Sequence, residues 1–301
     1  MANQIIIFGR LLKGSFQDLK ENDPLRLAAA TAFIATFSLT PAIVLLINLL
    51  GLILDEEMVT GELFEALESM VGGDTAEQIQ NILMNIQELK AETVVTIGFF
   101  IFLMFIASTL FIVVLNSFNQ IWKIKPKESR RFKFVLKSRG IALVIILLTG
   151  ILFLLALLSD IVMAFIGSEL VEGLPTVGVW ALRIFNQVIS LGIFTVWFAC
   201  VYKFLPDIAI PWKPVWVGAF LAAVLFSIGQ FILGQLLIDS QIDDIYGASS
   251  SLALLFLFIF YCSFILYYGI CFIKNYIQYF HYEAHPKKFT VRYEIREVEE
   301  G

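Results

Sequence analysis

Charge is scarce in this sequence. Charged residues make up 16% of its 301 residues, whereas soluble domains carry about 25%. No Asp, Glu, Lys or Arg stands in the middle of any long apolar run, and the hydrophobic fraction is 59% with a mean hydropathy of +0.84. This balance excludes an ordinary soluble domain. It also disfavours an ion-driven pump, because such proteins use ionisable side chains inside the membrane.

Residues that perform catalysis or bind metals are few as well. The two histidines form the sequence His281-Tyr-Glu-Ala-His285, which would place both imidazoles on one helical face, but no third ligand accompanies them. No phosphate-binding glycine loop, nucleophile elbow or paired-carboxylate pattern is present. We therefore expect no enzymatic activity, no metal site and no cofactor. Cys200, Cys262 and Cys271 fall in or near apolar runs, so we expect apolar filler residues rather than a disulfide framework.

What the chain does have is long apolar runs. Six of them are long enough to cross the roughly 30 Å hydrocarbon core as helices, since a lone strand could not satisfy its backbone groups in lipid. They cover approximately residues 28–54, 94–115, 140–158, 188–205, 215–238 and 251–273. The sequence therefore predicts an all-α fold, a polytopic membrane bundle of six transmembrane helices within residues 28–280.

Charges in the connections alternate along the chain. The 55–93 segment holds ten acidic residues and one base, whereas the 116–139 segment holds eight bases and one acid. Acids without bases follow in 159–182 and 239–250, and bases return after the last span. The positive-inside rule then places both termini and the 116–139 loop in the cytoplasm. We expect the 55–93 segment outside, with an amphipathic helix in its second half.

The two ends of the chain lie outside the predicted spans. We expect no cleavable signal peptide in residues 1–27, which combine Leu11, Leu12 and Phe16 with polar neighbours. This pattern is typical of an amphipathic helix on the membrane surface. Residues 281–301 have mixed charge and are expected to form a cytoplasmic tail.

A few polar or helix-breaking residues interrupt the apolar runs and are candidates for a substrate path. They lie on the first, fourth and fifth runs: Thr36, Ser38, Pro41, Asn186, Gln230 and Gln235. Pro41 removes a backbone donor, so a nearby hydroxyl can cover the freed carbonyl. The polar side chains would serve equally as contacts between helices. The sequence leaves both interpretations open.

The basic stretch 123–139 has two interpretations. It can bind anionic lipid headgroups, since each Lys or Arg near the surface contributes about 1 kcal/mol. It can also be a topology determinant without a ligand. No nucleic-acid-binding motif or interleaved aromatic residues accompany the charge. Membrane lipids are therefore the expected partners, and nucleic acid is not.

One acid stands among bases in the turn between the fourth and fifth runs. Pro206 stops the fourth run, and the turn belongs to the basic side of the protein. Asp207 follows immediately and needs a partner there. Lys203, Lys213 or the 123–139 stretch would supply one.

Four short motifs stand out along the chain. They are Phe37-Ser-Leu-Thr-Pro41, Ser117-Phe-Asn-Gln-Ile-Trp122, Tyr202-Lys-Phe-Leu-Pro-Asp207 and Ile245-Tyr-Gly-Ala-Ser-Ser-Ser251. In this order and spacing they resemble the YihY/BrkB family of bacterial inner-membrane proteins, over about residues 20–276. The matching motif residues are Asn119, Trp122, Pro206, Asp207, Tyr246 and Gly247. The chain departs from the family pattern at Cys271, where the resemblance predicts a glutamate.

The resemblance implies a six-helix, multi-pass protein of the bacterial inner membrane. Some members were labelled ribonuclease BN, a name regarded as mistaken, and a role in moving envelope lipids or other substrates has been suggested for relatives. We therefore expect the protein to bind or translocate an amphipathic or lipidic envelope substrate. The alternative is a non-transporting envelope scaffold, and ribonuclease activity is the least favoured hypothesis.

Overall fold

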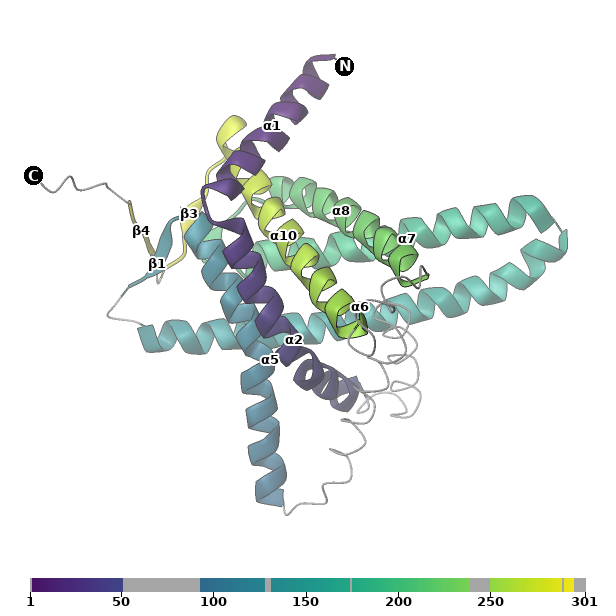
Figure 1. The fold of residues 1–301 in the computed structure, drawn as a ribbon, viewed down its shortest axis with the longest axis horizontal. Helices are drawn as coiled ribbons and strands as arrows, with labels where there is room; N and C mark the ends of the chain where they lie inside the picture. The colour runs from purple at the N-terminus through teal and green to yellow at the C-terminus, as the bar shows by residue number, and fades with distance from the viewer. Residues whose placement is uncertain are drawn as a thin grey trace, which may run out of the picture.

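The computed structural model describes residues 2–50, 93–127, 131–173, 175–238, 250–288 and 290–294, and helices dominate this part of the chain. The helices are α1 (Ala2–Lys20), α2 (Pro24–Leu50), α5 (Thr93–Ile121), α6 (Arg131–Gly173), α7 (Pro175–Phe204), α8 (Trp212–Ile238) and α10 (Ser250–Tyr279) (Figure 1). The short strands are β1 (Ile124–Pro126), β2 (Ile208–Ala209), β3 (His285–Pro286) and β4 (Thr290–Arg292). The predicted external helix in 55–93 and the motif residues Tyr246 and Gly247 lie outside the described residues.

Five of the described helices are long and apolar enough to cross a membrane. The qualifying stretches are Ile101–Ile121, Lys133–Ala156, Ile184–Phe204, Trp212–Ile232 and Ala253–Tyr279. The remaining predicted span falls on α2, where the apolar stretch found is the shorter Pro24–Leu39. An all-α membrane bundle is therefore the fold class, while the count of six spans stays a prediction.

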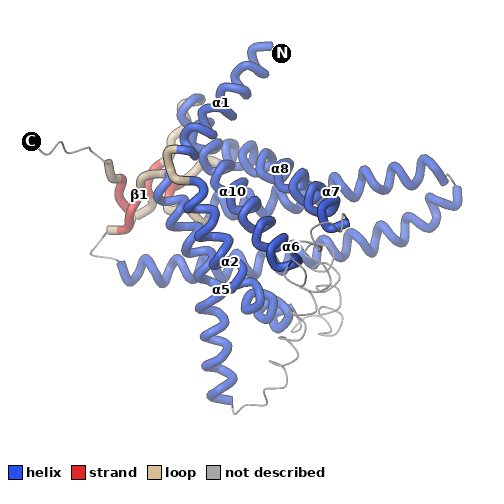
Figure 2. Tube along the Cα trace, in the orientation of Figure 1, coloured by secondary structure: helices blue, strands red, loops and turns tan. Residues whose placement is uncertain are grey.

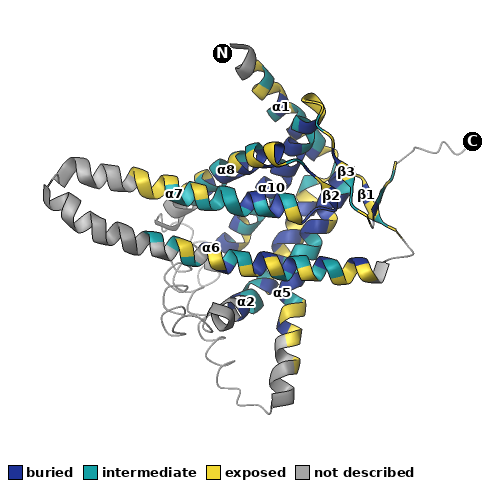
Figure 3. Ribbon diagram, turned by 180° about the vertical axis from the view of Figure 1, so that it is seen from behind, coloured by how far each residue is buried: buried dark blue, intermediate teal, exposed yellow. Residues whose placement is uncertain are grey.

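The membrane helices pack in a closed order. α6 contacts α7, α7 contacts α8, α8 contacts α10, α10 contacts α2, α2 contacts α5, and α5 contacts α6 again. Fully buried aromatic rings from three of these helices meet in the core, with the Phe118 centroid 5.9 Å from that of Tyr202 and 6.1 Å from that of Tyr267. Buried residues follow the faces where helices meet, and exposed ones follow the outward faces (Figure 3).

The N-terminal helix α1 is docked along α10. Leu11, Ser15 and Leu19 are buried at four-residue spacing, which places them on one helical face. The Tyr268 hydroxyl donates to the Leu12 carbonyl over 3.1 Å, and the Lys274 ammonium pairs with Asp18 over 2.7 Å. The polar-and-apolar pattern of residues 1–27 thus serves helix packing in the described structure.

Two boundaries differ from the sequence-based expectation. The 116–139 segment is a connection only around residues 122–130, because α5 runs to Ile121 and α6 starts at Arg131. Lys and Arg are good helix formers, so the basic residues extend a helix rather than interrupt it. Likewise 159–182 is largely helical. With 43 residues, α6 is about 65 Å long at 1.5 Å per residue, and the α6–α7 pair extends well beyond the other helices (Figure 1).

A third difference concerns the two histidines. α10 ends at Tyr279, and His281 has a backbone φ of 53°, which ends the helical path. His285 belongs to strand β3. The expectation that both imidazoles share a helical face was therefore wrong.

Two antiparallel ribbons join the C-terminal segment to interhelical turns. Strand β1 pairs with β4, with Lys125 opposite Val291, and strand β2 pairs with β3, with Ala209 opposite His285. Figure 2 shows these strands and the tan turns gathered at the end of the helices near α1. We call this end, formed by residues 21–23, 122–127, 205–211 and 280–294, the strand end of the bundle.

Candidate functional site

The buried acid Asp207 is the centre of the strand end. Asp207 is only 2% exposed, although it lies in a short turn between α7 and α8. The Asn119 amide, from the last turn of α5, binds it twice: Nδ2 donates to Oδ2 over 3.1 Å, and Oδ1 accepts the Asp207 backbone N–H over 3.1 Å. These two family-motif residues, 88 positions apart, thus form one contact.

Lysines from three different segments surround this carboxylate. Lys137 of α6 lies 3.4 Å from Oδ1 of Asp207. Lys287 of the tail donates its ammonium to the Pro206 carbonyl over 2.6 Å, and its backbone N–H to the Asp207 carbonyl over 2.9 Å. Lys203 of α7 donates to the Ile210 carbonyl. Of the expected partners for Asp207, the basic 123–139 stretch therefore supplies the ion pair, through Lys137.

Partial burial makes the Lys287 side chain less basic than an ordinary lysine. Desolvation lowers the pKa of its ammonium from 10.5 to about 8. The Asp207 charge opposes this fall, whereas Lys137 and Lys203 add to it. Thr290 adds another contact between the tail and this turn, because its hydroxyl donates to the Asp207 carbonyl over 3.2 Å. These contacts hold the tail against the α7–α8 turn, which Asn119 of α5 and Lys137 of α6 also contact through Asp207.

A second polar contact ties α1 to the other helices beside Cys271. The Lys274 ammonium pairs with Asp18 and also donates to the Ile121 carbonyl at the end of α5 over 3.1 Å. Cys271, where the family resemblance predicts an acid, is fully buried one helical turn earlier. The carboxylate facing Lys274 is thus supplied by α1 rather than by α10.

The candidate path residues do not meet in one place. Thr36 donates to the Ala32 carbonyl of its own helix over 2.9 Å, and Ser38 donates to Ile106 of α5 over 3.3 Å. Pro41 lies within a continuous α2. Asn186 is exposed on α7 and Gln230 is half-buried on α8, while the side chain of Gln235 is outside the described part. None of the five that are described lines any of the cavities discussed below.

A small apolar cavity lies among five of the helices. Its volume is about 200 Å³, and side chains of α2, α5, α7, α8 and α10 line it, among them Leu110, Phe198 and Phe258. The lining is almost wholly apolar, and Thr31 and Ser263 have hydrogen-bond partners in the protein. A lining of this kind offers no polar route.

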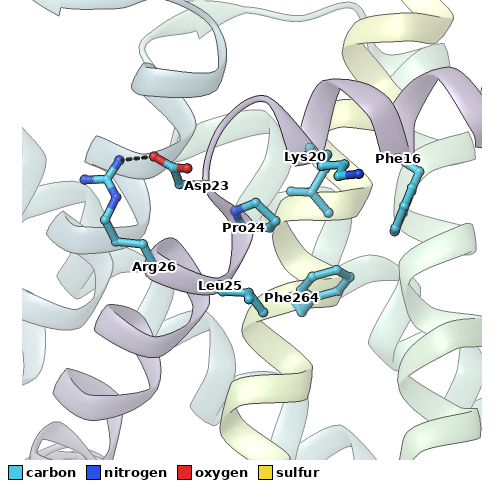
Figure 4. A pocket seen from close by; sticks show the side chains of 8 residues that line it. Phe16, Lys20, Asp23, Pro24, Leu25, Arg26 and Phe264 are labelled. Carbon is cyan, nitrogen blue, oxygen red and sulfur yellow. Dashed lines mark ion pairs between the residues drawn. The ribbon is translucent and has the colours of Figure 1, made fainter.

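The larger opening is a groove between α1, α2 and α10, next to the strand end. Its volume is about 720 Å³. The lining residues are Phe16, Leu19, Lys20, Asp23, Pro24, Leu25, Arg26 and Phe264. Leu25 and Phe16 are 66% and 53% exposed, and Figure 4 shows Leu25 beside Phe264, with Phe16 across the groove. Volumes of 300–1,000 Å³ are about the size of small-molecule sites.

Charged groups stand on either side of Pro24 at the rim of this groove (Figure 4). Asp23 has a φ of 52°, and its carboxylate lies 3.5 Å from the Arg26 guanidinium. Lys20 stands on the α1 side. Sequence reasoning missed this groove, although exposed apolar residues around the Asp23-Pro24 pair were its available signal.

Within the described residues, no group of three or more His, Cys, Asp or Glu side chains could hold a metal ion. His285 instead lies 3.2 Å from Glu283 on the surface. The Trp122 indole N–H, another family-motif group, is buried and has no acceptor in the part of the chain that the structure describes.

Comparison with known proteins places the chain by a family model. The family model described as virulence factor BrkB matches residues 15–289. No curated protein and no solved structure gives a match. The matched range includes the helices from α2 to α10, the strands β1 and β2, and the groove.

Proposed function

The chain belongs to the family described as virulence factor BrkB, and from this membership together with the groove we propose that it binds and translocates an amphipathic, lipidic substrate of the bacterial envelope. The protein would act in the inner membrane with six spans and both termini in the cytoplasm. It would have no catalytic activity, so neither ribonuclease chemistry nor a cofactor is part of the proposal.

The groove between α1, α2 and α10 is the observation that carries this proposal. It combines an apolar floor of Phe16, Leu25 and Phe264 with charged groups at one rim. An amphipathic lipid has the same division into an apolar and a charged part. The smaller cavity, at about 200 Å³ and lined by apolar side chains, offers no comparable place for a charged headgroup. Lateral entry from the bilayer therefore suits the substrate better than a path through that cavity.

The proposed orientation is supported by the strand end. Two connections with basic residues, 122–127 and 280–294, gather there with the 205–211 turn, which Lys203 and Lys213 flank. Lys123, Lys125, Lys127 and Lys133 are exposed around it, where they would meet anionic headgroups of the cytoplasmic leaflet.

A second candidate is a non-transporting scaffold of the envelope. The contacts that favour it are those that cross-link the strand end, chiefly Asn119 with Asp207 and Asp18 with Lys274. Such contacts would hold a rigid platform equally well. The two candidates differ in whether lipid moves.

The test is reconstitution into liposomes that contain a headgroup-labelled phospholipid. Wild type should move the label between leaflets faster than empty vesicles do. Leu25→Trp adds bulk inside the groove at a highly exposed position and should slow the movement. Phe33→Trp is the matched control, since Phe33 is 58% exposed on the same helix and does not line the groove. Wild-type flux equal to that of empty vesicles would reject translocation and leave the scaffold.

A further inference from the structure

The groove carries an inference about headgroup chemistry, which rests on the proposed function. We infer that it holds a zwitterionic phospholipid whose headgroup ends in a primary ammonium, of the phosphoethanolamine type. The phosphate lies between Lys20 and the start of α2, the ammonium lies at Asp23, and the acyl chains lie along Phe16, Leu25 and Phe264.

The acyl part follows from the apolar floor. Leu25 and Phe16 leave most of their side-chain surface uncovered, and Phe264 of α10 lies beside Leu25 (Figure 4). The groove lies against α2 and α10, and α10 carries one of the membrane-spanning stretches. Chains that start at the rim can therefore continue into the bilayer alongside these helices.

The phosphate position follows from unused donors at the start of α2. Pro24 has no N–H, and the Leu27 N–H is bonded to the Asp23 carbonyl over 3.1 Å. The N–H groups of Leu25 and Arg26 lie between them, and neither has an acceptor among the described residues. Both residues line the groove. A phosphate accepts such donors and is favoured by the positive end of the helix.

Lys20 adds the positive charge that a phosphate requires. It lines the groove on the α1 side, it is exposed, and within the described part of the chain it makes no ion pair. It stands across the groove from the start of α2 (Figure 4). The groove thus joins a free ammonium to two free backbone donors over an apolar floor.

The ammonium position follows from Asp23. An Asp immediately before the first residue of a helix usually caps that helix, because its carboxylate accepts backbone N–H groups of the first turn. Asp23 instead has the left-handed φ of 52° and directs its carboxylate to the exposed Arg26. An exposed pair of this kind is weak, so the carboxylate can accept from a ligand ammonium, which has three donors. A phosphoglycerol headgroup donates only through neutral hydroxyls and brings no positive charge to the carboxylate, and a quaternary ammonium has no N–H.

The experiment measures phospholipid binding by the full-length protein in nanodiscs of phosphatidylcholine. Trace phosphatidylethanolamine or phosphatidylglycerol competes for the protein, and native mass spectrometry counts the retained lipid. Wild type should prefer phosphatidylethanolamine over phosphatidylcholine about tenfold, the ratio expected from one additional charge-assisted contact. Asp23→Asn should abolish that preference, while Lys20→Gln should reduce retention of all three lipids.

Matched controls separate binding from folding. Glu21→Gln and Lys13→Gln change charges on exposed neighbours that do not line the groove, so they should behave as wild type. Asn tolerates a left-handed φ as well as Asp does, so Asp23→Asn should keep the melting temperature of Glu21→Gln. Equal retention of the three lipids by wild type, a preference for phosphatidylglycerol, or an unchanged preference in Asp23→Asn would overturn the inference.

The two proposals fail separately. Leaflet-to-leaflet movement of the labelled lipid without any headgroup preference would overturn this inference and keep the proposed function. A phosphatidylethanolamine preference without movement would keep this inference and reject translocation.

Discussion

The side chain of Asn119 binds both the backbone and the carboxylate of Asp207. Its amide donates to Oδ2 and its carbonyl accepts the Asp207 N–H, each over 3.1 Å. Both residues are buried, at 4% and 2% exposure. The end of α5 is thereby joined to the turn that connects α7 with α8.

Asn119→Ala should therefore destabilise the protein by about 2–4 kcal/mol, since it removes the Asn119 contacts of two buried groups, the Oδ2 atom and the backbone N–H of Asp207. Chemical or thermal unfolding in detergent measures this loss. Asn116→Ala, an exposed position one turn earlier on α5, is the control and should cost little. Combined with Asp207→Asn, Asn119→Ala should lower the free energy of unfolding by less than the sum of the two single losses, because the two residues share one contact.

The pH dependence of stability should carry a contribution from Lys287. Its pKa is about 8 in the folded protein and 10.5 as the ordinary value, so between these limits the unfolded chain binds more protons. The contribution of Lys287 to the free energy of unfolding must then rise as the pH increases from about 8 to about 10.5. The wild-type melting temperature minus that of Lys287→Gln should increase over this window. A flat or falling difference would contradict the buried position of the ammonium, and Lys288→Gln, an exposed neighbour, should give no slope.

Gly269 is required by the position of a tyrosine ring. A β-carbon at this residue would lie 2.0 Å from Oη of Tyr202, a fully buried side chain whose hydroxyl donates to Leu266. Gly269→Ala should cost about 1–3 kcal/mol through overpacking. Tyr202→Phe removes the hydroxyl and should recover part of that loss in unfolding measurements. Gly192→Ala, with nothing within 4 Å, should be neutral or stabilising, which separates the clash from a general effect of alanine.

The Asp18–Lys274 contact should determine how firmly α1 is docked. Asp18→Asn leaves the Lys274 ammonium, which is 15% exposed, without its carboxylate, and should cost about 1–3 kcal/mol. Hydrogen exchange of α1 amides should then speed up more than exchange in α8. Adding Lys274→Met to Asp18→Asn should restore much of the protection. Equal exchange in wild type and Asp18→Asn would show that α1 is held by its apolar face alone.

The sequence predicted the all-α membrane class, five of the membrane helices and the family from hydropathy and motifs. It also identified Asp207 as an acid in need of a basic partner and named the 123–139 stretch among the possible sources. Lys137 of that stretch is the partner. These predictions succeeded because long apolar runs and a lone charge are visible one residue at a time.

The tail contacts could not be predicted in the same way. Strands β2 and β3 are two residues long, and Lys287 reaches the Asp207 turn through backbone groups as well as its ammonium. Backbone pairing over so few residues produces no periodic side-chain pattern. The groove was missed for a related reason, since Phe16 and Phe264 lie far apart in the sequence and only the docking of α1 on α10 brings them together.

The ribbons have a consequence for how the protein is made. Residues 285–292 leave the ribosome after every described helix, and until they arrive the Asp207 carbonyl lacks the donors Lys287 and Thr290. Helices can insert one after another during translation, but the strand end can close only when synthesis of this segment is complete. A chain that stops before this segment therefore leaves the Asp207 carbonyl without these two donors.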